Sequence, residues 1–230
     1  MIEKYAHAEG LRIRYCEAGE GEPVIMLHDS EGLRWSAFHE LLAGHRRIIV
    51  PELPGFRSSP ANGGSLSMRD LARAMGSFAS NLGLEHYRLV GTWLSARIAL
   101  WQAVEAPERI DALALISPAA IVPDNWSPLA GTSEEFVKLS GPKRDSVLES
   151  KLREITAPVL VVFGTRDAVI PPETGRIYRE RMPNCYYILM YNSGHAIEAE
   201  RPQALYQLID DFLERGDAFI VNRASGLINP

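Results

Sequence analysis

Short apolar runs alternate with amphipathic segments through most of this chain, and this alternation limits the folds that the chain can adopt. The runs are mostly apolar, which is typical of strands that are covered on both faces. Strands of this kind alternating with helices predict an α/β protein with a mostly parallel sheet and helices on both of its faces. The five runs are residues 24–27, 47–50, 87–90, 112–116 and 158–163.

Further segments complete this architecture. Residues 2–9 and 11–17 alternate apolar and polar side chains around Gly10, which predicts an antiparallel hairpin at a sheet edge. Residues 186–190 predict one more strand. Apolar residues at helical spacing predict helices over residues 35–43, 68–82, 94–104, 173–182 and 202–214, the second capped by Ser67.

The residues that directly follow the predicted strands are the first candidates for a functional site. Sheets of this kind bind ligands at the carboxyl ends of their strands, where the loops meet. These candidates are residues 28–32, 52–59, 92–95, 117, 164–167 and 195.

Taken in order, these segments resemble the motifs of the α/β-hydrolase family from about residue 11 to residue 214. Gly91 lies in a strand, a turn and a helix that resemble the turn on which this family carries its nucleophile, in the pattern Gly-x-Ser-x-Gly. Asp167 matches the family's acid, and His195 matches its base. The resemblance therefore implies an α/β-hydrolase fold. The segments that carry it are residues 28–32, 52–59, 89–100, 106–110, 161–171 and 193–196.

The chain departs from the family's pattern around that turn. Trp93 occupies the place of the nucleophile, and an indole cannot attack a carbonyl carbon. Ser95 replaces the second glycine, and the added bulk in a strained turn leads us to expect a relaxed turn. Asp29 replaces the glycine after His28, where its carboxylate would oppose the negative charge of an oxyanion. Together the three changes indicate a site rebuilt for chemistry other than acyl transfer.

The resemblance places catalysis on His195 and Asp167. A carboxylate behind an imidazole fixes its tautomer and makes it a general base near neutral pH. The alternative is a hydrogen-bonded pair without a function. For Trp93 two interpretations stand: a side chain that fills an abandoned pocket, or a wall on which a flat substrate stacks. The predicted pocket residues are Trp93, His28, Asp29, Ser30, Leu94 and Ser117.

Other polar residues near the predicted site have structural interpretations. Ser30 and Ser117 are candidates for a replacement nucleophile, although serines in loops and at strand ends more often cap turns. We expect the Ser95 hydroxyl to point away from the catalytic base, the Thr92 side chain to face the sheet, and Glu52 to brace its loop.

The composition is that of a soluble globular protein, with 46% hydrophobic and 23% charged residues. A net charge of −5 argues against a nucleic-acid or anionic-membrane partner, and no apolar stretch is long enough to span a bilayer. Cys16 and Cys185 lack metal or redox spacing, so two buried thiols are expected. No metal site and no cofactor are predicted. We expect a cytoplasmic protein with a small-molecule substrate, and homo-oligomerisation is left open.

We expect a single domain over residues 1–230. Only about 40 residues separate the predicted strands at 112–116 and 158–163, and the family's cap is usually larger. The resemblance therefore implies a reduced cap, a short insertion at about residues 119–156 with one helix within 133–154. Residues 216–230 form a C-terminal tail, in which residues 218–221 are suited to an edge strand.

The sequence thus predicts an enzyme that acts on a small organic substrate through His195 and Asp167 without a serine acyl-enzyme. Lyase, isomerase, decarboxylase and water-mediated hydrolysis reactions all fit such a pair. One alternative is an esterase-type hydrolase with a displaced nucleophile such as Ser30, and another is a non-catalytic binding protein on a hydrolase scaffold. A cavity filled by Trp93 favours the binding protein, a serine bonded to the His195 ring favours the esterase, and an open cavity favours the two-residue site.

Overall fold

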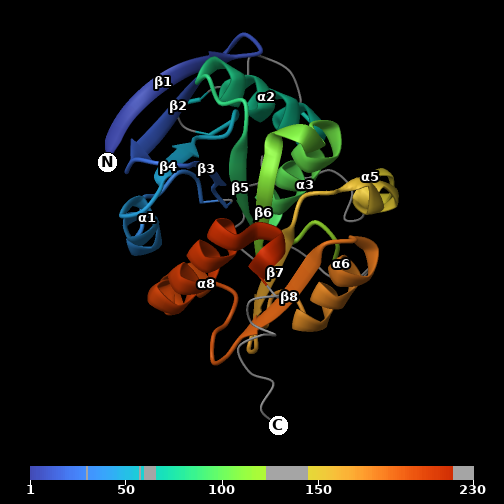
Figure 1. Cartoon of the computed structure of the whole chain (residues 1–230). Coiled ribbons are helices and arrows are strands. Elements are labelled where there is room, and N and C mark those ends of the chain that lie inside the picture. The colour runs from blue at the N-terminus through green and yellow to red at the C-terminus, as the bar shows by residue number, and fades with distance from the viewer. Residues whose placement is uncertain (30, 57, 60–65, 123–144, 220–230) are drawn as a thin grey trace.

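The computed structural model describes residues 1–29, 31–56, 58–59, 66–122 and 145–219. Its strands are β1 (Ile2–Ala8), β2 (Leu11–Ala18), β3 (Pro23–Leu27), β4 (Arg47–Pro51), β5 (Tyr87–Thr92), β6 (Ile110–Ile116), β7 (Val159–Gly164) and β8 (Cys185–Met190). They form one sheet in the order β1-β2-β4-β3-β5-β6-β7-β8 (Figure 1). β2 pairs antiparallel with β1 and with β4, and every pair from β4 to β8 is parallel.

Helices cover both faces of this sheet (Figure 1). The α-helices are α1 (Ala37–Ala43), α2 (Met68–Asn81), α3 (Ala96–Glu105), α5 (Ser146–Lys151), α6 (Gly175–Arg181), α7 (Ile197–Glu200) and α8 (Pro202–Arg215). Short 3-10 turns are η1 (Trp93–Ser95), η2 (Pro107–Arg109), η3 (Leu152–Glu154), η4 (Pro172–Thr174) and η5 (Gly216–Ala218). Helices α2, α3, α5 and α6 pack on one face, and α1 and α8 pack on the other. The predicted mostly parallel sheet with helices on both faces is confirmed.

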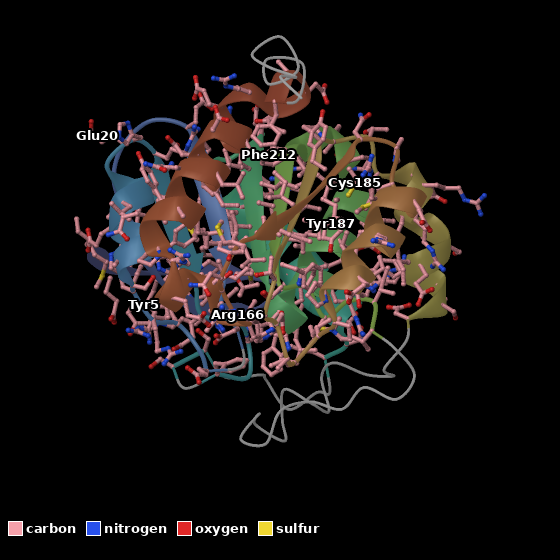
Figure 2. All side chains as sticks on the ribbon, turned by 90° about the horizontal axis from the view of Figure 1, so that it is seen from below. Tyr5, Glu20, Arg166, Cys185, Tyr187 and Phe212 are labelled. Carbon is pink, nitrogen blue, oxygen red and sulfur yellow. The ribbon has the colours of Figure 1, made fainter. Side chains whose placement is uncertain are left out.

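Burial on both faces explains why the central strands are continuously apolar. In β6, Leu113 and Leu115 pack under α2 and α3, while Ala112 and Ala114 face the opposite way, toward α8. Because side chains alternate between faces along a strand, each position of β6 from Ala112 to Ile116 needs an apolar residue. Side chains fill the layers on both sides of the sheet (Figure 2).

The described ends of the predicted insertion belong to the core and not to a cap. The backbone N–H of Ala119 donates a hydrogen bond to the Trp93 carbonyl oxygen (2.9 Å), and residues 119–122 are buried. At the other end, Asp145 accepts a hydrogen bond from the Trp101 indole of α3 (3.0 Å). The centre of the insertion, residues 123–144, lies outside the described residues, so the reduced cap stays a prediction.

The C-terminal tail begins differently from the prediction. Gly216–Ala218 form the turn η5, so an edge strand does not start at Ala218. Phe219 is buried, and its ring packs edge-on against Phe212 of α8 with the ring centres 5.5 Å apart. Burying this aromatic ring stabilises the turn more than pairing at a solvated edge would. Residues 220–230 lie outside the described residues.

Gly91 brings β5 and α3 into close contact at the point where the sheet positions the candidate site. A Cβ atom at Gly91 would lie 2.9 Å from the Cα of Ala96 and 2.9 Å from the Cβ of Ala99. Only a residue without a side chain leaves room for α3 at this distance. The turn that leaves β5 is therefore forced to be short.

We expect Gly91→Ala to lower the free energy of unfolding by about 1–3 kcal/mol, because the new methyl group overpacks the contact with α3. Urea denaturation followed by circular dichroism measures this change. Gly76→Ala is the matched control, since its Cβ atom would meet the Gln102 side chain at an ordinary 3.8 Å. In the middle of α2 that substitution should stabilise the protein by about 0.5–1 kcal/mol. Equal stability of Gly91→Ala and the wild type would contradict the close contact.

Candidate active site

The turn between β5 and α3 has a strained backbone. Trp93 has a φ of +52°, in the left-handed region that residues other than glycine rarely adopt. The Trp93 carbonyl oxygen accepts the N–H of Ala119, which holds the turn against the end of β6. The expectation of a relaxed turn is therefore wrong.

Ser95 explains why the turn stays tight. Its buried hydroxyl accepts a hydrogen bond from the Thr92 backbone N–H (3.0 Å). The same hydroxyl lies 3.0 Å from the Leu27 carbonyl oxygen and 2.8 Å from the Thr92 carbonyl oxygen. These two oxygens share its single proton. The hydroxyl thus links β3, β5 and the turn, and it makes no hydrogen bond with the His195 ring, as the sequence predicts. Because these bonds use both its donor and its acceptors, Ser95 stabilises the strained conformation.

Asp167 and His195 form a hydrogen-bonded pair at the carboxyl ends of β7 and β8. The Asp167 Oδ2 atom lies 2.9 Å from His195 Nδ1. Its Oδ1 atom accepts the backbone N–H groups of Val169 and Ile170, each at 2.9 Å. The Asp167 carboxylate is fully buried, so its orientation is fixed on both oxygens. A carboxylate at Nδ1 places the proton of a neutral His195 there and leaves Nε2 as an acceptor.

The loop that carries His195 is tied to the strands beneath it. The Ser117 hydroxyl, after β6, donates a hydrogen bond to the His195 carbonyl oxygen (3.0 Å). Gly164 at the end of β7 lies against the loop, because a Cβ atom there would be 2.2 Å from the Gly194 carbonyl oxygen. Glu200 of α7 accepts the Gly194 N–H at 2.7 Å. These contacts hold the imidazole in one place without touching its Nε2 atom.

The Trp93 side chain packs beside the His195 ring. The two ring centres are 5.8 Å apart in an edge-to-face arrangement, and Trp93 is only 6% exposed. Its Nε1 atom is buried and has no hydrogen-bond partner within the described part of the chain. His195, by contrast, keeps 18% of its side chain exposed. Trp93 therefore covers one side of His195 but does not enclose it.

His28 and Asp29 follow β3 on the opposite side of the turn. His28 Nδ1 donates to the Asp29 carbonyl oxygen (2.6 Å), and its Nε2 accepts the Leu53 N–H (2.9 Å). Burial lowers the pKa of His28 to about 4, so this ring is neutral and structural. Burial also raises the pKa of Asp29, although the positive charge of Arg34 opposes that effect.

These groups meet at a cavity of about 610 Å³. The structure brings His28, Asp29, Trp93 and His195 together on its wall. Leu94 and Ser117 do not line it, which corrects the prediction for both: Leu94 is buried in the core, and Ser117 is bonded to the back of the His195 loop. Ser30 lies outside the described residues. The remaining wall residues are Met26, Leu27, Glu31, Gly32, Arg34, Trp35, Ser36, His39, Thr92, Ile116, Ala196, Ile197, Glu198 and Ala199.

Two polar wall residues, Thr92 and Glu198, were not among the predicted pocket residues. The Thr92 side chain was predicted to face the sheet. Its hydroxyl instead donates a hydrogen bond to Oε1 of Glu198 (2.8 Å). The pKa of Glu198 is raised to about 7, chiefly by burial and further by the neighbouring Asp29 carboxylate, while the bond from Thr92 acts the other way. One signal for Glu198 was its position three residues after His195.

The fold of the whole chain is similar to that of solved structures. The meta-cleavage product hydrolase CumD from Pseudomonas fluorescens superposes with a TM-score of 0.78 over 92% of this chain and 97% of its own, at 19% identity. The chain is an α/β-hydrolase-fold protein. A family model described as "TAP-like protein" matches residues 137–218.

Curated relatives cover nearly the whole of this α/β-hydrolase-fold protein. A 2-hydroxy-6-oxononadienedioate/2-hydroxy-6-oxononatrienedioate hydrolase of Pseudomonas putida is 26% identical over 89% of this chain and 92% of its own length. A 2-hydroxy-6-oxo-6-(2'-aminophenyl)hexa-2,4-dienoic acid hydrolase of Metapseudomonas resinovorans is 24% identical over 93% and 91%. Each of these relatives is named as a hydrolase of a small organic acid.

Further polar groups in this α/β-hydrolase-fold protein have structural roles. Glu52 accepts hydrogen bonds from Arg14 (3.1 Å) and from the Ser58 N–H (2.9 Å), which confirms that it braces its loop. Cys16 and Cys185 are both buried free thiols, as expected. Among the residues with described positions, no three His, Cys, Asp or Glu side chains gather closely enough to hold a metal ion. No helix in the same ranges is both long and apolar enough to cross a membrane.

The retained turn leads us to expect that Trp93→Ser gains labelling by a fluorophosphonate probe. Serine at this backbone position would stand beside a His195 ring whose Nε2 is an acceptor. Labelling is measured by intact-protein mass spectrometry. Trp93→Ala is the matched control, since it creates the same space without a hydroxyl, and both variants should lose about 3–5 kcal/mol of stability.

Adding His195→Ala to Trp93→Ser should slow the labelling by at least about 100-fold, because the general base is lost. Equal labelling of folded Trp93→Ser and Trp93→Ala would contradict the geometry of the turn.

Proposed function

We propose that this protein is an enzyme that acts on a small organic substrate by general acid–base catalysis at His195, supported by Asp167, without a serine acyl-enzyme. One observation carries the proposal. The Asp167–His195 pair is complete and His195 lines an open cavity, while Trp93 holds the place of the nucleophile. A site that keeps its base but has no hydroxyl at the nucleophile position of the turn favours proton transfer to and from substrate or water.

In the hydrolytic form of the reaction, His195 Nε2 takes a proton from a water molecule. The water oxygen forms a bond to the substrate carbonyl carbon, and the π electrons of that carbonyl move onto its oxygen. The carbonyl then re-forms and the bond from its carbon to the leaving group breaks. The leaving group keeps that electron pair and takes the proton of the imidazolium, which Asp167 stabilises. The net result is the addition of one water molecule. Lyase, isomerase and decarboxylase steps use the same base on a proton of the substrate.

The relatives favour the hydrolytic form. Their names describe hydrolases of 6-oxo dienoic acids, in which a ketone stands at carbon 6. A ketone that is attacked by water needs a general base and does not need a protein nucleophile. We therefore propose carbonyl-containing organic acids as the first substrates to test.

Ser95 and Ser117 do not support a displaced nucleophile. The hydroxyls of Ser95 and Ser117 are bonded to backbone groups, and neither is bonded to the His195 ring. The cavity beside His195 likewise gives the non-catalytic interpretation no support, because Trp93 does not fill it. A cytoplasmic location stays a prediction.

We expect the wild-type protein to turn over at least one member of a panel consisting of 2-hydroxy-6-oxononadienedioate and p-nitrophenyl esters of short acids. His195→Ala should lower kcat/KM by at least about 100-fold, because a positioned general base contributes about 10²–10⁴ to the rate. Absorbance assays of purified protein measure the effect. Glu20→Gln, an exposed change at the amino end of the sheet, serves as the control.

Fluorophosphonate should leave the wild-type protein unlabelled while turnover continues. Labelling of a serine, with loss of turnover, would overturn the proposed mechanism and favour the displaced nucleophile.

A further inference from the structure

The cavity contains a second group that is able to move a proton. Glu198 lies on the wall that also carries His195, and it comes from α7, directly after the His195 loop. The Thr92 hydroxyl donates to Oε1 at 2.8 Å, which fixes the carboxyl group. No basic side chain forms an ion pair with Glu198 among the described residues. Glu198 is partly buried, its carboxyl group is held in one orientation, and it has no ion-pair partner among these residues. We conclude that Glu198 is not part of a salt bridge there.

The charges around Glu198 favour its neutral form. The titratable and charged residues on the same wall are Asp29, Glu31, Arg34, His28, His39 and His195. Arg34 lowers the pKa of Glu198, but it is ion-paired with Glu31, and burial and Asp29 outweigh its effect. His28 and His39 are held neutral by burial, which lowers the pKa of each to about 4. Asp29 is the remaining carboxylate that acts on Glu198, and it raises the pKa of Glu198 as burial does.

We propose that Glu198 is a catalytic residue, the general acid that donates a proton to the substrate oxygen while His195 acts as the base. This inference rests on the proposed function and adds a second residue to it. Because Thr92 donates to Oε1, the proton of the neutral carboxyl group is carried by Oε2. A Glu198 acid paired with a His195 base also suits a site that contains the Asp29 carboxylate. The negative charge that develops on the substrate oxygen is neutralised by a proton from Glu198 and is not held by backbone N–H dipoles.

The protons of the proposed step balance. Water gives one proton to His195 Nε2 and forms a bond to the carbonyl carbon. The carbonyl π electrons move to the oxygen, which takes the proton of Glu198, so that a neutral diol forms beside an imidazolium and a carboxylate. As the carbonyl re-forms, Glu198 takes back the hydroxyl proton and the bond between the carbonyl carbon and the leaving group breaks. The leaving group keeps that electron pair and takes the proton of His195. Both residues return to their starting states, and one water molecule has been consumed.

The first test measures protonation of Glu198 directly. In protein labelled with ¹³C at the glutamate carboxyl carbons, the resonance missing from Glu198→Gln belongs to Glu198. We expect it to titrate near pH 7. In Asp29→Asn the midpoint should move to lower pH, because the carboxylate that favours the neutral form is gone. A wild-type midpoint at the ordinary value for glutamate, near 4.3, would overturn the inference.

The second test measures turnover of the same panel, 2-hydroxy-6-oxononadienedioate and the p-nitrophenyl esters, between pH 5 and 9. For the wild type we expect kcat to fall as the pH rises through about 7, where Glu198 loses its proton. Glu198→Gln should lower kcat by about 10²–10⁴ with little change in KM, and its remaining activity should lack that fall. Glu20→Gln should match the wild type.

The outcomes separate the two proposals. Turnover that depends on His195 but is unchanged in Glu198→Gln overturns the role of Glu198 and leaves the proposed function standing. Absence of wild-type turnover on the whole panel counts against the proposed function and, with it, against this inference. A midpoint near 7 together with the loss of kcat in Glu198→Gln supports both.

Discussion

The close contact between β5 and α3 at Gly91 determines where the turn that carries Trp93 lies. Since α3 begins against the end of β5, the connection has room only for a tight turn, and Trp93 takes up the strain in a left-handed backbone. Strain of this kind persists only where surrounding contacts hold it. Here the Ser95 hydroxyl supplies them, because it bonds to both Thr92 and Leu27. The result is a turn built for a nucleophile that carries an indole instead.

The Asp29 carboxylate has a strong effect on the electrostatics of the site. Asp29 stands after β3, where a hydrolase of this fold would stabilise an oxyanion, and its charge makes that role unfavourable. The same charge favours the neutral form of Glu198 across the cavity. We therefore propose that the Trp93 and Asp29 departures are two parts of one altered site.

The sequence predicts the sheet well because each central strand is buried on both faces. Leu113 and Ala114 illustrate this: both are apolar, and each serves a different layer. The Asp167–His195 pair was also predictable, since motif order alone places both residues after neighbouring strands. The strained backbone at Trp93 was not predictable. It depends on hydrogen bonds from the Ser95 hydroxyl to a strand far away in the sequence, and such bonds cannot be deduced from a local pattern.

The direction of individual side chains was the least predictable feature. Thr92 was expected to face the sheet, and only the packed position of α7 shows that it bonds to Glu198. Ser117 follows a strand, as the other site residues do, yet its hydroxyl turns to the back of the His195 loop. Strand ends identify the region of a site, whereas the loops that fold over it decide which side chains enter.

The central claim is that His195 works without a covalent intermediate, and rapid-quench mass spectrometry tests it most directly. The intact protein would be acid-quenched within milliseconds of mixing with excess p-nitrophenyl acetate and throughout steady turnover. The account predicts the unmodified mass at every time point while p-nitrophenol accumulates. An adduct of one acetyl group, formed and lost at the rate of turnover and mapped to a serine, would contradict it.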